Sequence, residues 1–456
     1  MSVKETVDFI CPPGLRGTKR RLEASPLARR LIRGAFWSLV GTVLSRLLGL
    51  LASIFVARMI GKIGLGELGI IQSTVGMFST LAGLGLGLTA TKHVAEHRVV
   101  NPVLVGETIG LLSLISWGSG LLMTLVILFL SPWLAAHTLA APQLAPELES
   151  GSLLLLFGVI NGVQTGILSG FEAFKSIARI NLICGLANFP ILVCGAYFAG
   201  LPGAVWGLVI SLALNCGLNF LAVRREAASA GAVITYRHAH KHWPLLWRFG
   251  LPGMLSGLIA GPVNWGTSTL LVNQHGGYAE MGILNATNTW FQALAFLPNL
   301  LGQVLLPILA SYMAVQNRNG LQRALVLSTW ANFIIVLPVA ILGSLFSPYI
   351  MGLYGAGFDQ GWPVLVLTLL GGLVLMVQGP VTNQLIATSK MWAYFLSHVV
   401  WAAIFVLGTY LWVSSHGSVG LALARLLAYT VGGLVVAAFV WFHSRQPEND
   451  GPSLKP

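Results

Sequence analysis

Long apolar stretches alternate with short polar segments along almost the whole chain. A membrane-spanning helix needs about 20 mostly apolar residues, and twelve stretches reach that length. They cover roughly 34–57, 69–91, 104–130, 150–170, 179–199, 203–223, 248–273, 282–306, 324–346, 363–388, 392–414 and 418–443. Very short connections at 200–202 and 415–417 predict two helical hairpins. The pattern therefore predicts an all-α polytopic membrane protein with about 12 transmembrane helices.

Composition supports a membrane environment. Of the 456 residues, 55% are hydrophobic and only 9% are charged, whereas soluble domains carry about 25% charged residues. So few charges cannot cover a water-exposed surface, and disorder requires the opposite balance of low hydrophobicity and high charge. A soluble globular protein and a disordered chain are both excluded.

The positions of the basic residues predict the orientation. Of the 26 Lys and Arg residues, 22 lie in the two terminal tails and in alternate loops, and two more, Arg58 and Lys62, lie in the opposite loops. The remaining two, Arg46 and Arg425, lie inside spans. Because basic loops remain on the cytoplasmic side, the N and C termini are predicted to be cytoplasmic. The basic tail is too long for a cleavable signal peptide and is expected to contact anionic lipid.

An internal repeat with an offset of about 215 residues predicts two similar halves. Five matches occur in the same order at offsets of 213–216: Glu67-Leu68-Gly69-Ile70 with Glu280-Met281-Gly282-Ile283, Ser131-Pro132 with Ser347-Pro348, Gln164 with Gln378, Lys175 with Lys390, and Gly203 with Gly417. The expected organisation is a basic cytoplasmic tail (1–33), an N-terminal six-helix bundle (34–223), a basic cytoplasmic linker (224–247), a C-terminal six-helix bundle (248–443) and a cytoplasmic tail (444–456). Six spans per half give a parallel repeat, with a pseudo-two-fold axis along the membrane normal. This arrangement is typical of alternating-access transporters.

Polar residues inside the spans indicate a substrate cavity. In hydrocarbon they are costly, so they are expected to face a cavity or one another. The span at 282–306 carries five amide residues on one helical face, and Asn264 lies in the preceding span. The five are Asn285, Asn288, Gln292, Asn299 and Gln303. An amide-rich lining suits hydroxyl-rich ligands; the alternative is hydrogen bonding between helices.

Two intramembrane arginines are candidate phosphate contacts. The planar guanidinium donates several hydrogen bonds in a geometry that matches phosphate, and Arg46 lies near the middle of its span. Arg425 lies nearer a span end, where its side chain could instead reach the interface. Arg58 and Lys62 are placed at the rim of an exit.

Other chemistry is sparse. His398 and Glu107 are candidates for ion coupling, with a packed histidine and an interfacial carboxylate as the alternatives. The chain has no GxxxxGK[ST] or HExxH motif, and none of its four cysteines forms a CxxC pair. The expectation is a transporter that is not an enzyme and that uses no cofactor, metal ion or nucleic acid.

Several segments resemble one protein family. They are Gly34-Ala35-Phe36-Trp37-Ser38, Ser45-Arg46-Leu47-Leu48-Gly49, Ala57-Arg58-Met59-Ile60-Gly61, Leu168-Ser169-Gly170-Phe171-Glu172-Ala173-Phe174-Lys175 and Leu353-Tyr354-Gly355-Ala356-Gly357-Phe358. Together they resemble the polysaccharide-flippase branch of the MOP superfamily, which includes the MATE exporters, and the likeness extends over roughly 34–443.

The resemblance implies a flippase of the bacterial inner membrane. Such a protein moves undecaprenyl-pyrophosphate-linked oligosaccharide units for O-antigen, capsule or exopolysaccharide, and a polysaccharide polymerase and a chain-length regulator are possible partners beside the membrane lipids. Lipid II flippases of the superfamily also have an arginine at the position of Arg46, but they usually continue with an Arg-Asp pair where this chain has Ala52 and Ser53. The alternatives are a cation-coupled drug or small-molecule exporter of the MATE type and a polysaccharide polymerase.

Overall fold

The computed structural model describes the backbone of residues 26–83, 85–98, 100–236, 251–314, 318–387 and 391–445. The predicted basic tail (1–33), linker (224–247) and C-terminal tail (444–456) therefore lie wholly or partly outside the described residues. Side chains are described over a smaller part of the chain, and the side chain of Gln303 is among those left out.

The described chain is all-helical, as predicted, and contains no strand. The helices are α3 (Pro26–Gly83), α4 (Leu86–His97), α5 (Pro102–Trp133), α6 (Ala145–Gly170), α7 (Phe174–Ser229), α8 (Leu251–Val272), α9 (Gly277–Ala314), α10 (Arg318–Leu345), α11 (Ser347–Gly352), α12 (Trp362–Ala387) and α13 (Met391–Arg445). Short π and 3-10 turns are η2 (Leu134–Thr138), η3 (Pro142–Leu144) and η6 (Asp359–Gly361).

Three of these helices are broken inside. Helix α3 is broken at Gly61, α7 at Ala199 and Gly200, and α13 at Gly417. Gly200 (φ 58°, ψ −132°) and Gly417 (φ 53°, ψ −129°) have backbone angles that favour glycine. They lie in the two short connections of the predicted hairpins, so the chain reverses direction at both.

A fourth break differs from the sequence prediction. The predicted span at 69–91 is not one continuous helix, because α3 ends at Gly83 and α4 begins at Leu86. Gly85 between them has φ 65°. The glycines at 83, 85 and 87 lower the helix propensity of this stretch, whereas the apolar pattern that predicted the span does not register them.

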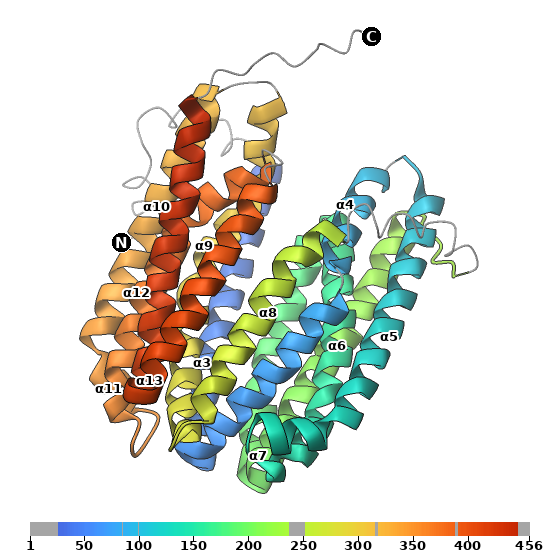
Figure 1. Cartoon of the computed structure of the whole chain (residues 1–456). Helices are drawn as coiled ribbons and strands as arrows, with labels where there is room; N and C mark the ends of the chain where they lie inside the picture. Colours follow the sequence, from blue (N-terminus) through green and yellow to red (C-terminus); the bar gives the residue numbers. More distant parts are fainter. Residues whose placement is uncertain are drawn as a thin grey trace.

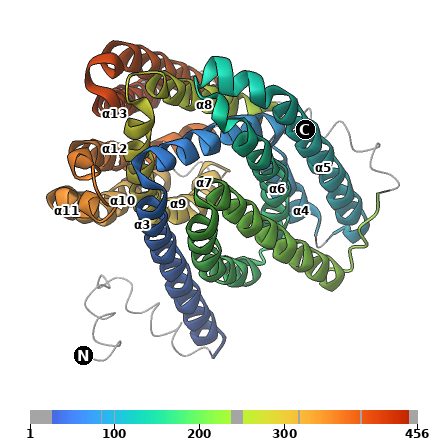
Figure 2. The same cartoon turned by 90° about the horizontal axis from the view of Figure 1, so that it is seen from below.

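The helices form two groups that lie side by side (Figure 1). The N-terminal group consists of α4–α7, and the C-terminal group consists of α9–α13. Helix α3 packs against α7 of the first group and α9 of the second, and α8 packs against both α3 and α13. In the view from below, α11–α13 lie at one side of the molecule and α4–α6 at the other (Figure 2).

Within the described residues, seven helical stretches are long and apolar enough to cross a membrane: Val43–Gly83, Pro102–Thr138, Pro142–Gly170, Phe174–Ser229, Asn319–Leu345, Asp359–Leu385 and Trp392–Val440. Large apolar side chains also lie on the outside of these helices. Phe129 is 84% exposed and Phe198 is 82% exposed, which suits a surface in contact with lipid. Length, hydropathy and outward-facing apolar side chains thus agree on a multi-pass membrane protein.

Glycines allow α3 and α9 to cross at close range. A Cβ atom at Gly66 would overlap the backbone carbonyl of Tyr278, and one at Gly282 would overlap the carbonyl of Lys62. Small residues at such a crossing let two backbones approach closely inside a membrane. The crossing joins α3 directly to the C-terminal group.

Hydrogen bonds extend this junction. Three side chains donate across it to backbone carbonyls: Asn285 Nδ2 to Leu65 at 3.1 Å, Tyr278 Oη to Leu139 at 2.8 Å, and Arg58 Nε to Leu353 at 2.7 Å. One hydrophobic core contains buried residues of both groups, including Ile127 of α5 and Leu284 of α9, together with Ile71 of α3. The two groups are therefore connected by both packing and polar contacts.

Candidate functional site

A pocket of about 770 Å³ lies in the C-terminal half of the chain. Its lining comes from α8, α9, α10, α12 and α13. Asn264 of α8 and Asn299 of α9 are solvent-exposed, so they mark its open side. Asn332, Met376 and Ala428 are buried and mark its inner end. The pocket therefore leads from an exposed edge of α8 and α9 into the helices behind them.

Amide side chains lie at the inner end of the pocket. Asn332 of α10 is 5% exposed, and its Nδ2 donates to the carbonyl of Met376 at 2.9 Å. Its Oδ1 is buried without a hydrogen-bond partner, and so is Oε1 of Gln378 on α12. Buried polar atoms normally have a partner, so both oxygens can still accept a hydrogen bond, although Oε1 of Gln378 packs against Gly433 of α13.

An aromatic wall from α13 lines the same pocket. Tyr394, His398 and Trp401 follow one another at spacings of four and three, which places them on one helical face. The ring centroids of Tyr394 and His398 are 4.3 Å apart, and those of His398 and Trp401 are 6.4 Å apart. After the break at Gly417 the chain returns with Tyr429, whose ring is nearly parallel to that of Trp401 at a centroid distance of 6.3 Å.

The predicted amide face of α9 is divided among several surroundings. Asn285 faces α3, where it donates to Leu65, and Asn288 accepts a hydrogen bond from Arg425 of α13. Gln292 is exposed, and Asn299 lines the pocket. The side chain of Gln303 lies outside the described residues. Helical spacing identified the right helix, but the neighbours of each turn determine where each amide points.

The two intramembrane arginines both contact α9. Arg425 Nη1 donates to Asn288 Oδ1 at 2.8 Å, and its guanidinium lies 5.7 Å from the ring centroid of Phe405. Arg46 on α3 is exposed, and its guanidinium lies 5.5 Å from the ring centroid of Phe296. No ion pair within the described part of the chain includes either arginine, so both keep a positive charge that an anionic ligand could neutralise.

The remaining predicted residues do not gather at the pocket, except His398. Arg58 donates to Leu353 in the loop after α11, and the side chain of Lys62 lies beside Gly357 in the same loop. These two basic residues therefore hold α3 to that loop. Glu107 is half-buried in the second turn of α5, in the N-terminal group. His398 lines the pocket, and its Nδ1 lies 3.0 Å from the carbonyl oxygen of Tyr394.

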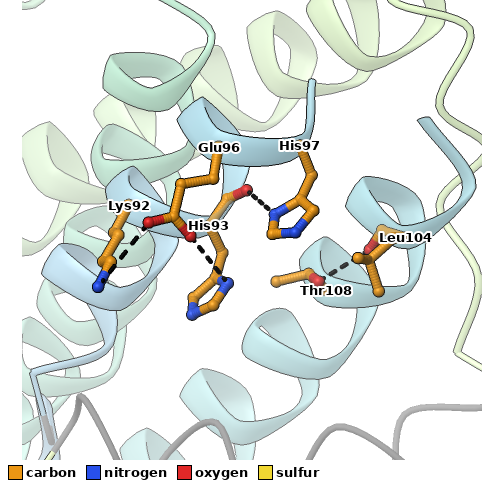
Figure 3. A network of polar contacts seen from close by, with 6 residues as sticks. All are labelled: Lys92, His93, Glu96, His97, Leu104 and Thr108. Atoms are coloured by element: carbon orange, nitrogen blue, oxygen red, sulfur yellow. Dashed lines mark hydrogen bonds and ion pairs between the residues drawn. The ribbon is translucent and has the colours of Figure 1, made fainter. Parts of the chain in front are cut away.

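A second polar cluster, on α4, has the chemistry of a metal site (Figure 3). His93, Glu96 and His97 offer ligand atoms that all lie within 4.8 Å of one another. Lys92 Nζ lies 3.8 Å from Glu96 Oε1, and His93 Nδ1 lies 3.9 Å from Glu96 Oε2. The carboxylate therefore already has a cationic neighbour, and the cluster belongs to the N-terminal group, apart from the pocket. The spacing His93-x-x-Glu96-His97 carries this signal in the sequence, but the sequence prediction does not include it.

The sequence prediction also missed the residues that shape the pocket. Trp401, Tyr429 and Asn332 were not among its candidates, and Gln378 entered only as a marker of the repeat. A signal was available, because Tyr394, His398 and Trp401 share one face of a predicted span. Aromatic residues are more often part of a core, and Asn332 and Gln378 are single amides in otherwise apolar spans, so neither kind of residue stands out in the sequence.

A family described as "Polysaccharide biosynthesis protein" matches residues 31–313. The EPS I polysaccharide export inner membrane protein EpsE of Ralstonia solanacearum is 22% identical over 307 residues, which cover 65% of this chain and 69% of that protein. The lipopolysaccharide biosynthesis protein WzxC of Escherichia coli K12 is 24% identical over 418 residues, covering 90% of this chain and 80% of that protein.

Solved structures share the fold at low sequence identity. The lipid II flippase MurJ in an inward closed conformation superposes with a TM-score of 0.69 at 16% identity, covering 89% of this chain and 87% of MurJ. A multidrug resistance MATE family transporter of the MOP superfamily, in an outward-facing conformation, gives a TM-score of 0.67 at 18% identity and covers 93% and 96%. These likenesses establish the MOP-type fold.

Proposed function

Because this chain belongs to the family of polysaccharide biosynthesis proteins, we propose that it is a flippase for undecaprenyl-pyrophosphate-linked oligosaccharide units. It carries them across the bacterial inner membrane for the synthesis and export of surface polysaccharide, by alternating access between the two groups of helices. The names of EpsE and WzxC support a role in polysaccharide export and biosynthesis. The MOP-type fold supports transport and gives no support to an enzymatic role.

One observation carries the proposal: a positive charge without a carboxylate partner lies beside a neutral polar pocket. Arg425 precedes Tyr429, which lines the pocket, by about one helical turn. A lipid-linked oligosaccharide has a matching order of groups, with an anionic pyrophosphate next to uncharged sugars. Arg425 and Arg46 bind the pyrophosphate in this proposal, and Asn288 orients Arg425 by accepting its hydrogen bond.

The proposal keeps the membrane topology that the sequence predicts, with twelve spans. Each of the three broken helices, α3, α7 and α13, is counted as two spans, which raises the seven apolar stretches to ten. Helices α8 and α9 then bring the number of spans to twelve. Both termini are cytoplasmic because most basic residues lie on their side. The N-terminal and C-terminal six-helix bundles are the two halves of a parallel repeat.

The other predicted residues have auxiliary roles. Asn264 and Asn299 lie at the open side of the pocket, where the glycan enters, and Gln292 is exposed on α9. Arg58 and Lys62 contact the loop after α11, at the exit side. An ion-coupled drug exporter is less well supported. Of its two candidate coupling residues, Glu107 lies on α5, away from the pocket, and His398 lines the pocket without an Asp or Glu residue in the described lining.

The proposal is tested with the purified full-length chain in proteoliposomes. The substrate is lipid-linked repeat units extracted from a strain that lacks this protein, and the readout is the fraction of glycan accessible to an external glycan-cleaving enzyme. We expect transfer well above protein-free vesicles and a loss of about 10–100-fold in the Arg425→Ala variant. Arg224→Ala is the matched control, because Arg224 also lies over a ring, that of Phe220, at 4.9 Å, but in α7. Transfer no faster than in protein-free vesicles would disprove the flippase role.

A further inference from the structure

We propose that the pocket in the C-terminal group is a glycan subsite, in which uncharged sugar rings of the repeat unit lie between the aromatic wall of α13 and the amides of α10 and α12. This inference rests on the proposed function, because it assigns part of the flippase substrate to one place. It adds that the sugars are bound by one group of helices and are not only enclosed between the two groups.

The charges of the pocket decide which part of the substrate it binds. Its described lining contains no Asp, Glu, Lys or Arg residue, and His398 is its only histidine. A pyrophosphate would leave its charges unpaired there, which is unfavourable in a site screened from water. Arg425 lies next to this lining without belonging to it. The pocket is thus suited to neutral groups, and the anionic group is left to the arginines.

Three residues that line the pocket, Asn332, Gln378 and Trp401, each have an unsatisfied hydrogen-bonding atom. Oδ1 of Asn332, Oε1 of Gln378 and Nε1 of Trp401 are buried and have no hydrogen-bond partner. They comprise two acceptors and one donor. A sugar hydroxyl both donates and accepts, so one class of ligand can satisfy all three atoms. A lipid chain could satisfy none of them.

The aromatic residues provide the complementary apolar surface. Rings of Trp401 and Tyr429 are 11° from parallel with centroids 6.3 Å apart, and Tyr394 and His398 continue the wall. Sugar rings present flat C–H faces beside their hydroxyls, and C–H groups interact favourably with aromatic faces. Specific small-molecule sites combine such apolar walls with a few placed polar groups.

The size of the pocket agrees with this assignment. Its volume of about 770 Å³ falls in the range of about 300–1,000 Å³ typical of pockets that bury drug-sized ligands. A short oligosaccharide segment is a molecule of that size. The exposed Asn264 and Asn299 at the opening allow the rest of the glycan and the lipid to remain outside.

The test measures the affinity of two ligands for the same series of variants in lipid nanodiscs. The first ligand is the extracted lipid-linked repeat unit, and the second is undecaprenyl pyrophosphate, which lacks the glycan. Trp401→Leu removes the aromatic face and the N–H group, and Gln378→Leu removes the amide while keeping its bulk. We expect each variant to bind the glycan-bearing lipid about tenfold more weakly, the effect of roughly one hydrogen bond, and to bind undecaprenyl pyrophosphate as the wild type does.

Two further variants keep the result interpretable. Trp330→Leu makes the same change on α10 at a tryptophan that is 58% exposed and does not line the pocket, so it should change neither affinity. Trp401→Phe keeps an aromatic face and should retain most of the glycan preference. If Trp401→Leu and Gln378→Leu bind both ligands as the wild type does, or lose affinity equally for both, the glycan subsite is wrong, while the flippase role stands as long as the wild type transfers the glycan-bearing lipid. If the wild type binds neither lipid, both proposals fail.

Discussion

The two groups of helices differ in where their amide side chains lie. In the N-terminal group, Asn219 Nδ2 donates to Asn161 Oδ1 at 2.5 Å and to Asn215 Oδ1 at 2.8 Å, so Asn219 links the other two amides. Each group also has buried amide oxygens without a partner, on Gln164 of α6 and on Asn332 and Gln378 of the C-terminal group, but only Asn332 and Gln378 line the pocket. An unsatisfied amide thus lines a candidate binding site in one group only. Amide content alone does not locate a site; the partners of each amide do.

The largest effect is expected where the two groups are held together. Gly66→Ala places a Cβ against the carbonyl of Tyr278, and a backbone cannot move aside as a side chain can, so we expect destabilisation of about 3 kcal/mol, the upper end for overpacking. Unfolding in detergent micelles measures it. Gly49→Ala, on the same helix with nothing within 4 Å of the added Cβ, is the control. Equal stability of the two variants would show that the crossing at Gly66 is not tightly packed.

The next effect contrasts the arginines of the two halves. Arg425 is held by Asn288, whereas Arg46 is exposed and contacts only the ring of Phe296 among the contacts described. We expect Arg425→Ala to lower transport of the glycan lipid by about 10–100-fold, since it removes a charged donor, and Arg46→Ala to lower it less. Export of polysaccharide at matched protein levels is the measurement. A larger loss for Arg46→Ala would place the main phosphate contact on α3.

Gln164 and Gln378 lie at matching positions of the predicted repeat, so the same substitution can be compared in the two groups. Gln378→Leu should weaken binding of the glycan lipid about tenfold, whereas Gln164→Leu, the matched change in α6, should leave it unchanged. Both are measured with the same ligand in nanodiscs. Similar losses in the two variants would mean that both groups bind the glycan equally. A glycan subsite in the C-terminal group alone would then be wrong.

The smallest effect concerns stability. Asn219→Leu removes both hydrogen bonds of the N-terminal trio, and bonds between membrane helices contribute about 0.6 kcal/mol each on average. We expect the free energy of unfolding to fall by about 1 kcal/mol with glycan affinity unchanged. Asn332→Leu should show the reverse pattern, a smaller loss of stability with weaker glycan binding. Denaturant titration and the nanodisc assay together separate the two; a loss of glycan affinity in Asn219→Leu would contradict the assignment.

Much of the fold could be predicted because it depends on local pattern. Apolar runs gave the helices, and the short connections at Gly200 and Gly417 gave the hairpins, since few residues other than glycine adopt their backbone angles. The break at Gly85 was missed because a hydropathy pattern does not weigh helix propensity. Neither the number of spans nor the repeat follows from the broken helices alone, and both stay predictions.

The site was predicted less completely, for a physical reason. Helical periodicity places Asn285, Asn288 and Asn299 on a face of α9. It does not predict which helix packs against each turn of that face. The structure places Asn285 against α3, Asn288 against Arg425 and Asn299 in the pocket. Trp401 and Tyr429 come together only because the chain reverses at Gly417, so their pairing depends on tertiary contacts. Proximity of that kind cannot be read from spacing along one helix.

The step we propose is the movement of a glycan-bearing lipid from the cytoplasmic to the periplasmic leaflet. Its most direct measurement is the sidedness of lipid-linked glycans in a deletion strain, using a label that reacts only with periplasmic glycans. We expect repeat units to stay unlabelled in the deletion strain and to become labelled when the wild-type chain, but not Arg425→Ala, is restored. Normal labelling of unpolymerised units in the deletion strain would contradict it and would place the role after the transfer step.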